Sequence, residues 1–180
     1  MMKSPLGQHL PMQQVTLEEG LIAFRCPESS GHYITLQAYW SWLKKQPERL
    51  EHLPQPPDIA PDASEPKSAK ICPETGTIMI HYKVGHGFSF SIDRSITGGV
   101  WFDAGEWEAL RSRNFHDEIH LIFTAPWQNA VMMAAAQEVH RNMLSERLGE
   151  TLLEELQTLR EQLKSHPHRD LALAYLNNVK

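Results

Sequence analysis

The feature that most constrains the fold is an internal repeat, in which segments 4–45 and 72–113 match in order when the sequence is shifted by 68 positions. Tyr33 then falls on Trp101, Ile34 on Phe102 and Gly31 on Gly99. Few positions are identical, but the apolar, glycine and aromatic residues agree in order and spacing. Such a period predicts an internal duplication, with two small units of similar structure.

Each copy has the pattern of short strands. Phe88–Ile92 alternates apolar and polar residues, as expected of a half-buried strand, and Gln14–Arg25 has similar strand character. Gly98-Gly99 follows the strands of the second copy and permits a tight turn with positive φ. The pattern predicts a small meander of two or three strands in each copy.

A short helix is predicted to follow the strands of each copy. Asp103 is a suitable N-cap, and Glu106 three residues later completes a capping box for a helix over 104–113. In the first copy, Thr35 is the corresponding cap of a helix over 35–45.

The last third of the chain is predicted to be helical. Residues from Trp127 onward are rich in strong helix formers, which predicts one long helix over about 127–165 that Gly149 could kink or divide. A final short helix over 170–178 is expected to turn Leu171, Ala174 and Tyr175 inward. Trp127 is expected to dock the long helix onto the second copy, the alternative being an exposed partner contact.

The predicted fold class is therefore α+β. Its four parts are a first β module with a helix (1–53), a proline-rich solvated linker (54–70), a second β module with a helix (71–113) and a helical region (114–180).

The ends of the copies resemble zinc ribbons of the transcription factor IIB type, as found in small bacterial zinc-finger proteins. That family has the pattern Cys-Pro-x-Cys-Gly, a β-hairpin, then Cys-x-x-Cys-Gly-Gly-x-Trp-x-Asp. Here the head keeps Cys72-Pro73, and the tail keeps Gly98-Gly99-Val100-Trp101-Phe102-Asp103. The resemblance implies two ribbon modules over about 4–45 and 71–113.

The resemblance also implies four zinc-ligand positions in each copy, and most hold unsuitable residues. They are Ser4, Gly7, Cys26 and Ser29 in the first copy, and Cys72, Thr75, Arg94 and Thr97 in the second. A structural zinc site needs four thiolate or imidazole donors, and each copy retains one thiolate. We therefore expect neither zinc nor any other cofactor, and two unpaired thiols. Without zinc, stability must come from burial of the aromatic residues Tyr33, Tyr39, Trp40, Trp42, Trp101 and Trp107.

Other candidate sites have simpler explanations. His116 and His120 have a helical i, i+4 spacing that can hold a metal, but no third ligand follows from spacing. Asp103 and Glu106 are explained by capping rather than catalysis. No catalytic residue is predicted.

Composition restricts the class of function. The net charge is −5 and no block of the chain is basic, which argues against nucleic-acid binding. The chain has no apolar N-terminal segment and no apolar run long enough to span a membrane, so we expect a cytoplasmic protein.

These observations favour a non-enzymatic interaction or scaffold protein with a protein partner, and a homodimer formed through the leucine face of 127–165. The first alternative is a nucleic-acid-associated regulator, which the ribbon resemblance alone would suggest. The second is an enzyme with an unrecognised site, which no residue pattern supports.

Overall fold

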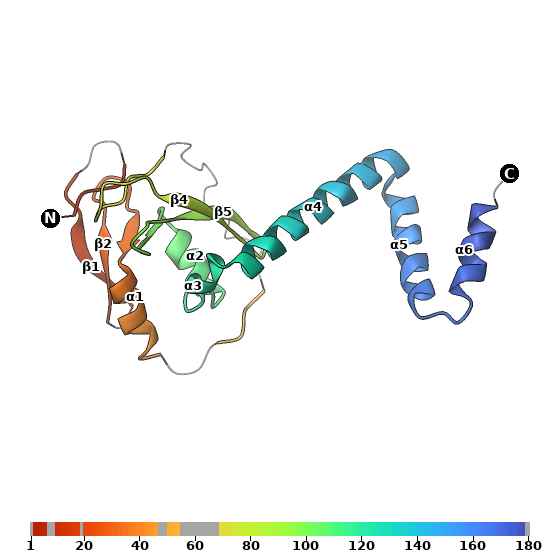
Figure 1. Cartoon of the computed structure of the whole chain (residues 1–180), viewed down its shortest axis with the longest axis horizontal. Coiled ribbons are helices and arrows are strands. Elements are labelled where there is room, and N and C mark those ends of the chain that lie inside the picture. The colour runs from red at the N-terminus through yellow and green to blue at the C-terminus, as the bar shows by residue number, and fades with distance from the viewer. Residues whose placement is uncertain (1, 7–9, 19, 47–49, 55–68, 179–180) are drawn as a thin grey trace. The chain divides into compact units, whose positions relative to one another are not determined.

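The computed structural model describes residues 2–6, 10–18, 20–46, 50–54 and 69–178. Within them the fold is α+β, with a six-stranded antiparallel sheet and six helices (Figure 1). The chain divides into two units, Met1–Val131 and Met132–Lys180, which we term the β unit and the helical unit. Of the predicted linker, residues 55–68 lie outside the described part.

The sheet joins two halves with the same order of elements. The first half contains β1 (Gln13–Glu18), β2 (Leu21–Arg25), β3 (His32–Ile34) and α1 (Leu36–Leu43). The second contains β4 (Ile80–Gly85), β5 (Phe88–Arg94), β6 (Val100–Phe102) and α2 (Glu106–Ser112). The strand order β1-β2-β3-β6-β5-β4 places β3 against β6 at the centre.

The central strand pair relates the two halves. Tyr33 lies opposite Trp101 in the β3–β6 ladder, and 33 + 68 = 101, so two residues matched by the sequence shift face each other. His32 pairs with Phe102 and Ile34 with Val100 on either side. Each half thus covers the inner edge of the other, and neither exposes an unpaired β3 or β6 backbone.

The sheet carries a core on each face. The larger core holds buried residues from β2 to β6 and from α1, α2 and α3 (Ile119–Ile122), and half-buried residues of β1 pack against it. In it Trp42 and Trp107 meet edge to face, with ring centroids 6.3 Å apart. The smaller core surrounds Tyr33 and Trp101, because successive side chains of a strand point to opposite faces. Of the aromatic residues expected inside, only Trp40 is exposed, at 39%.

The helix starts match the sequence prediction only in the first half. Thr35 Oγ1 accepts a hydrogen bond from the Ala38 N–H at 3.2 Å, so the predicted N-cap is confirmed. α2 begins at Glu106, and its N-cap is Gly105 at φ 85°, not Asp103. Glu106 Oε2 does accept a hydrogen bond from the Asp103 N–H at 2.7 Å, which keeps one half of the capping box.

Trp127 docks the start of α4 (Ala125–Leu148) onto the sheet. Its indole N–H donates to the Val84 carbonyl at 2.8 Å, and its ring packs against the larger core, so the docking prediction is confirmed. The long predicted helix is divided at Gly149, which has φ 79°, and α5 (Glu150–Lys164) follows. Glycine adopts this left-handed conformation without the steric cost of a Cβ.

The helical unit has little core of its own. Leu153 is its one buried residue among those described. In α6 (Arg169–Asn177), Leu171 is 72% exposed and Tyr175 is 80% exposed, so the prediction that both turn inward is wrong. Helical periodicity identified an apolar face but not whether another element covers it. No helix among the described residues is long and apolar enough to cross a membrane.

Candidate functional site

The expected ligand positions lie on tight turns of the β unit. In the first half, the Cys26 N–H donates to the Gly31 carbonyl at 2.9 Å. In the second half, the Ser95 N–H donates to the Gly99 carbonyl at 2.8 Å. A further turn joins the Cys72 N–H to the Thr77 carbonyl at 2.7 Å.

The turns of the two halves differ in length by one residue. Ser95, rather than Arg94, makes the hydrogen bond that corresponds to that of Cys26, because the second turn is one residue shorter than the first. The Arg94 guanidinium instead lies 4.9 Å from the centroid of the Phe123 ring, in a cation–π contact. A shift without gaps could not detect this one-residue difference.

The Tyr33 hydroxyl lies among the ligand positions of the second half. It donates to Glu74 Oε2 at 2.6 Å, and lies 3.2 Å from Ser95 Oγ and 3.7 Å from Cys72 Sγ. Thr97 Oγ1 donates to the same Glu74 oxygen at 2.6 Å and lies 2.6 Å from Ser95 Oγ. The phenol therefore lies beside Cys72 and Thr97, two of the positions that the ribbon resemblance assigns as zinc ligands.

Gly99 provides the room for this phenol. A Cβ at Gly99 would lie 2.0 Å from the Tyr33 hydroxyl oxygen, which no side chain could tolerate without a rearrangement. The predicted positive φ belongs to Gly98, at 86°, and not to Gly99. The two glycines thus have different roles: Gly98 makes the turn and Gly99 leaves space.

Trp101 has the equivalent position against the first half. A Cβ at Gly31 would lie 2.3 Å from Cζ2 of Trp101, and Trp101 shares the smaller core with Cys26 and Met12. The pairs correspond under the shift, since 31 + 68 = 99 and 33 + 68 = 101. Each half thus inserts its central aromatic residue against the turn glycine of the other half. We call Tyr33 and Trp101 the crossed aromatics.

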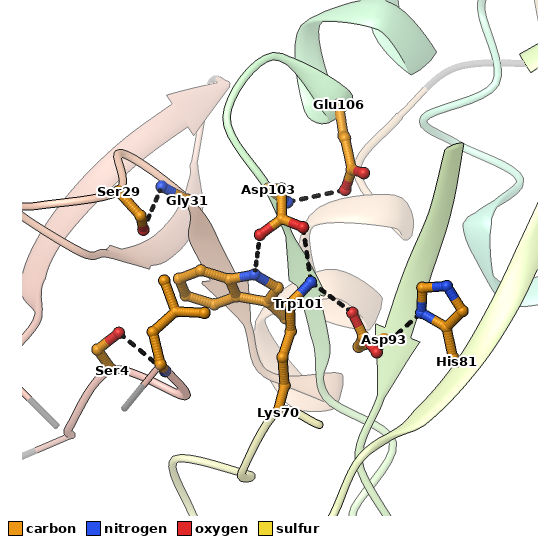
Figure 2. Close-up of polar contacts among 10 residues, drawn as sticks. Ser4, Ser29, Gly31, Lys70, His81, Asp93, Trp101, Asp103 and Glu106 are labelled. Atoms are coloured by element: carbon orange, nitrogen blue, oxygen red, sulfur yellow. Dashed lines mark hydrogen bonds and ion pairs between the residues drawn. The ribbon is translucent and has the colours of Figure 1, made fainter. Parts of the chain in front are cut away.

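The remaining ligand positions of the first half support its turns. Ser29 Oγ accepts from the Gly31 N–H at 3.3 Å, and Ser4 Oγ accepts from the Leu6 N–H at 3.2 Å (Figure 2). Gly7 lies outside the described residues. In the second half, Thr75 Oγ1 lies 2.8 Å from Thr77 Oγ1.

Both cysteines are buried free thiols. Burial raises the pKa of Cys26, but hydrogen bonds with Ser29 and Ser4 outweigh it and hold that pKa below its ordinary value. For Cys72 burial again raises the pKa, and hydrogen bonds with Thr75 and the Glu74 backbone bring it below the ordinary value. The sulfur atoms therefore keep polar neighbours on the turns.

A buried lysine joins two carboxylates, one of which also accepts a hydrogen bond from Trp101. Lys70 Nζ donates to Asp93 Oδ2 at 2.7 Å and to Asp103 Oδ2 at 2.6 Å, and the other Asp103 oxygen accepts from the Trp101 indole N–H at 2.7 Å (Figure 2). Asp93 Oδ1 lies 3.1 Å from His81 Nδ1. This network belongs to the second half only, because position 2 of the first half holds Met2.

Lys70 is only 3% exposed, and its pKa is consistent with a charged ammonium. Burial lowers the pKa of Lys70, but the hydrogen bonds to Asp103 and Asp93 raise it above its ordinary value. The sequence prediction placed Lys70 in a solvated linker, which is wrong. In the sequence, the one indication that Lys70 belongs to the second module is its position beside Ile71, where that module begins.

Glu106 adds a second titratable group beside Asp103. Burial raises the pKa of Glu106 to about 8, although the hydrogen bond from the Asp103 N–H lowers it. The nearby Asp103 charge also raises this pKa. Glu106 is therefore mostly protonated at neutral pH. Its side chain accepts a hydrogen bond from the backbone just before α2.

The two candidate histidines lie among aromatic rings. His116 lies 5.6 Å from the Trp42 ring and 6.0 Å from the Trp107 ring, and burial lowers its pKa. His120 Nδ1 lies 3.2 Å from the Tyr39 hydroxyl. In the part of the chain that the structure describes, no group of three or more His, Cys, Asp or Glu residues could hold a metal ion.

Comparison of the chain with models of protein families, with curated proteins and with solved structures finds no match. The ribbon resemblance therefore rests on the motif residues in the two halves.

Proposed function

We propose that the chain is a non-enzymatic interaction protein that forms a homodimer through its C-terminal helices. In this proposal the β unit is a duplicated, ribbon-like scaffold in which the crossed aromatics replace zinc. The helical unit provides the surface for association.

Side-chain geometry supports a metal-free scaffold. Cys72 lies beside the Tyr33 hydroxyl, Thr97 is hydrogen-bonded to Ser95 and Thr75 to Thr77. The first-half serines accept from turn backbone N–H groups. The buried Asp93 and the partly exposed Asp103 are both paired with Lys70. These polar groups hold the turns and the central rings in place, which is a structural role.

Exposed leucines in the helical unit carry the proposal of association. Leu148, Leu152 and Leu156 recur every four residues and are 40%, 45% and 43% exposed. In α6, Leu173 and Leu176 are 39% and 44% exposed. Complete burial of one leucine contributes about 1.5–3 kcal/mol, so covering this face with a second protein surface would stabilise a complex substantially. Apolar faces of this kind mark association surfaces.

Sedimentation equilibrium of the full chain tests the proposal. We expect the mass of a dimer, and a monomer for a variant carrying Leu152→Gln and Leu156→Gln. A matched variant with Thr151→Gln and Thr158→Gln, at exposed polar positions of α5, should remain dimeric. A wild-type chain that stays monomeric at every concentration tested would contradict self-association.

A further inference from the structure

The two sides of the α5–α6 hairpin are open grooves, one of them apolar and the other also lined by Arg160, Lys164 and Arg169. The larger has a volume of about 570 Å³ and is lined by Leu159, Leu163, Leu171, Tyr175 and Leu176, among others. The second, of about 380 Å³, is lined in part by Leu156, Leu159, Leu163 and Leu173. Because Leu159 and Leu163 line both grooves, α6 covers the leucine face of α5 only in part.

The leucines of α5 form a seam of heptad type. Leu152, Leu156, Leu159 and Leu163 follow one another at spacings of four, three and four residues. This is the alternation of a and d positions that packs helices together in coiled coils. The spacing is the same in both directions along the helix, so it suits a pair of identical helices running antiparallel.

The charges of α5 are divided between its ends. Glu150, Glu154 and Glu155 lie in the first half, whereas Arg160 and Lys164 lie in the second, beside Glu161. An antiparallel pair brings the acidic half of one copy to the half of the other that holds the two cations. A parallel pair would bring the three acidic residues of each copy together, which is unfavourable within a Debye length of about 8–10 Å.

From the seam, the grooves and the charge pattern we infer that the occupant of this face is α5 of a second copy, running antiparallel, with a two-fold axis that crosses the leucine seam between Leu156 and Leu159. Leu152 then packs against Leu163 of the second copy, and Leu156 against Leu159. α6 of each copy lies alongside, so the contact becomes a four-helix assembly. This inference rests on the proposed homodimer and adds its geometry.

Cysteine cross-linking of the full-length chain tests the orientation. In an antiparallel pair, two copies of residue 152 lie about 16 Å apart along the axis, as eleven residues separate positions 152 and 163 at 1.5 Å each. A disulfide needs Cα atoms within about 7 Å. Leu152→Cys and Leu163→Cys should therefore stay uncross-linked when each is oxidised separately. After the two variants are mixed and allowed to exchange subunits, a covalent dimer should form.

The outcomes separate the geometry from the proposed function. Cross-linking of each variant with itself, at the mass of a dimer, would overturn the antiparallel arrangement and leave the homodimer intact. A wild-type chain that sediments as a monomer would overturn both. Cys26 and Cys72 are buried in the β unit, and the unmodified chain serves as the control for their reaction.

A charge exchange tests the same geometry with every leucine in place. One variant carries Glu154→Arg and Glu155→Arg, and the other carries Arg160→Glu and Lys164→Glu. We expect each variant on its own to dimerise at least tenfold more weakly than wild type, and the mixture to recover most of the lost affinity. If each variant dimerises as tightly as wild type at low salt, the antiparallel arrangement is wrong.

Discussion

The two halves of the sheet fill equivalent spaces with different chemistry. The first half receives the apolar ring of Trp101 beside Gly31, and the second receives the Tyr33 phenol beside Gly99. Around Tyr33 lie hydroxyl and carboxylate groups of the turns, whereas the polar atom of Trp101 reaches out to Asp103. The two halves have a similar arrangement of strands and turns. The polar groups differ, because one half surrounds a phenol and the other an indole ring.

The comparison bears on the proposal that this sheet is stabilised by aromatic burial in place of a metal. Zinc contributes about 10–16 kcal/mol of apparent binding free energy to small zinc fingers. Here Tyr33 and Trp101 are both fully buried, and each links one half to the turns of the other. Stability is thereby coupled between the halves, and a change at either ring should affect the whole β unit.

The largest difference between the halves is the Lys70 network, which only the second half has. Its loss should have the largest effect on the free energy of unfolding. Lys70→Met leaves the buried Asp93 without its cation and should lower the free energy of unfolding by about 3–5 kcal/mol. Chemical denaturation measures this change. Lys83→Met, at an exposed position of β4, is the control and should change stability little. Equal effects of the two variants would show that the network does not anchor Trp101.

The turn glycines allow a direct comparison of the two ring sites. Gly99→Ala and Gly31→Ala should each cost about 1–3 kcal/mol, because the added methyl group overlaps Tyr33 or Trp101. Tyr33→Phe removes the hydroxyl that Gly99→Ala would contact, and so should reduce the cost of Gly99→Ala but not that of Gly31→Ala. Additive effects of Gly99→Ala and Tyr33→Phe in a double-mutant cycle would refute the assigned contact.

Glu106 makes the stability of the second half depend on pH. Its pKa is raised to about 8 by burial, so between about pH 4.5 and 8 the folded chain holds a proton that the unfolded chain releases. Stability should therefore fall as pH rises through this range. Glu106→Gln cannot ionise and should flatten the profile, with a gain of about 1–3 kcal/mol at pH 8. Glu108→Gln, an exposed neighbour, should leave the profile unchanged; an identical profile in wild type and Glu106→Gln would mean that Glu106 is already ionised.

The smallest expected effect is that of the Tyr33 hydroxyl itself. Tyr33→Phe keeps the ring and removes its hydrogen bonds to Glu74 and Ser95, which should cost about 0.5–1.5 kcal/mol. Trp101→Phe should cost more, because it removes both ring volume and the bond to Asp103. Equal thermal stabilities of the two variants would remove the distinction drawn between the two ring sites.

Local patterns in the sequence predicted the strands, the Thr35 cap and the docking of Trp127. Each of these predictions depends only on residues that are close together in the sequence. The signals are the alternation of a strand, the side chain of an N-cap and an aromatic residue beside a helix start. The sequence also matched Tyr33 with Trp101. It did not predict that each ring packs against the turn of the other half, because that depends on the pairing of β3 with β6. Burial of Lys70 was missed for the same reason: its partners Asp93 and Asp103 lie 23 and 33 residues away.

The helical unit shows a second limit of local reasoning. Periodicity correctly marked the leucines of α5 as one face, but it led to a wrong prediction for Leu171 and Tyr175, which are exposed. Burial depends on whether another element packs against a helix face. Among the described residues, no element packs over Leu171 and Tyr175 of α6.

The metal content of the purified full-length chain tests the central claim most directly, when it is combined with a thermal melt in the presence and absence of a chelator. We predict zinc far below one equivalent per chain and the same melting temperature under both conditions, because in the proposed scaffold the crossed aromatics replace the ion. Close to one equivalent of zinc or more, together with unfolding of the β unit when the chelator is added, would contradict it.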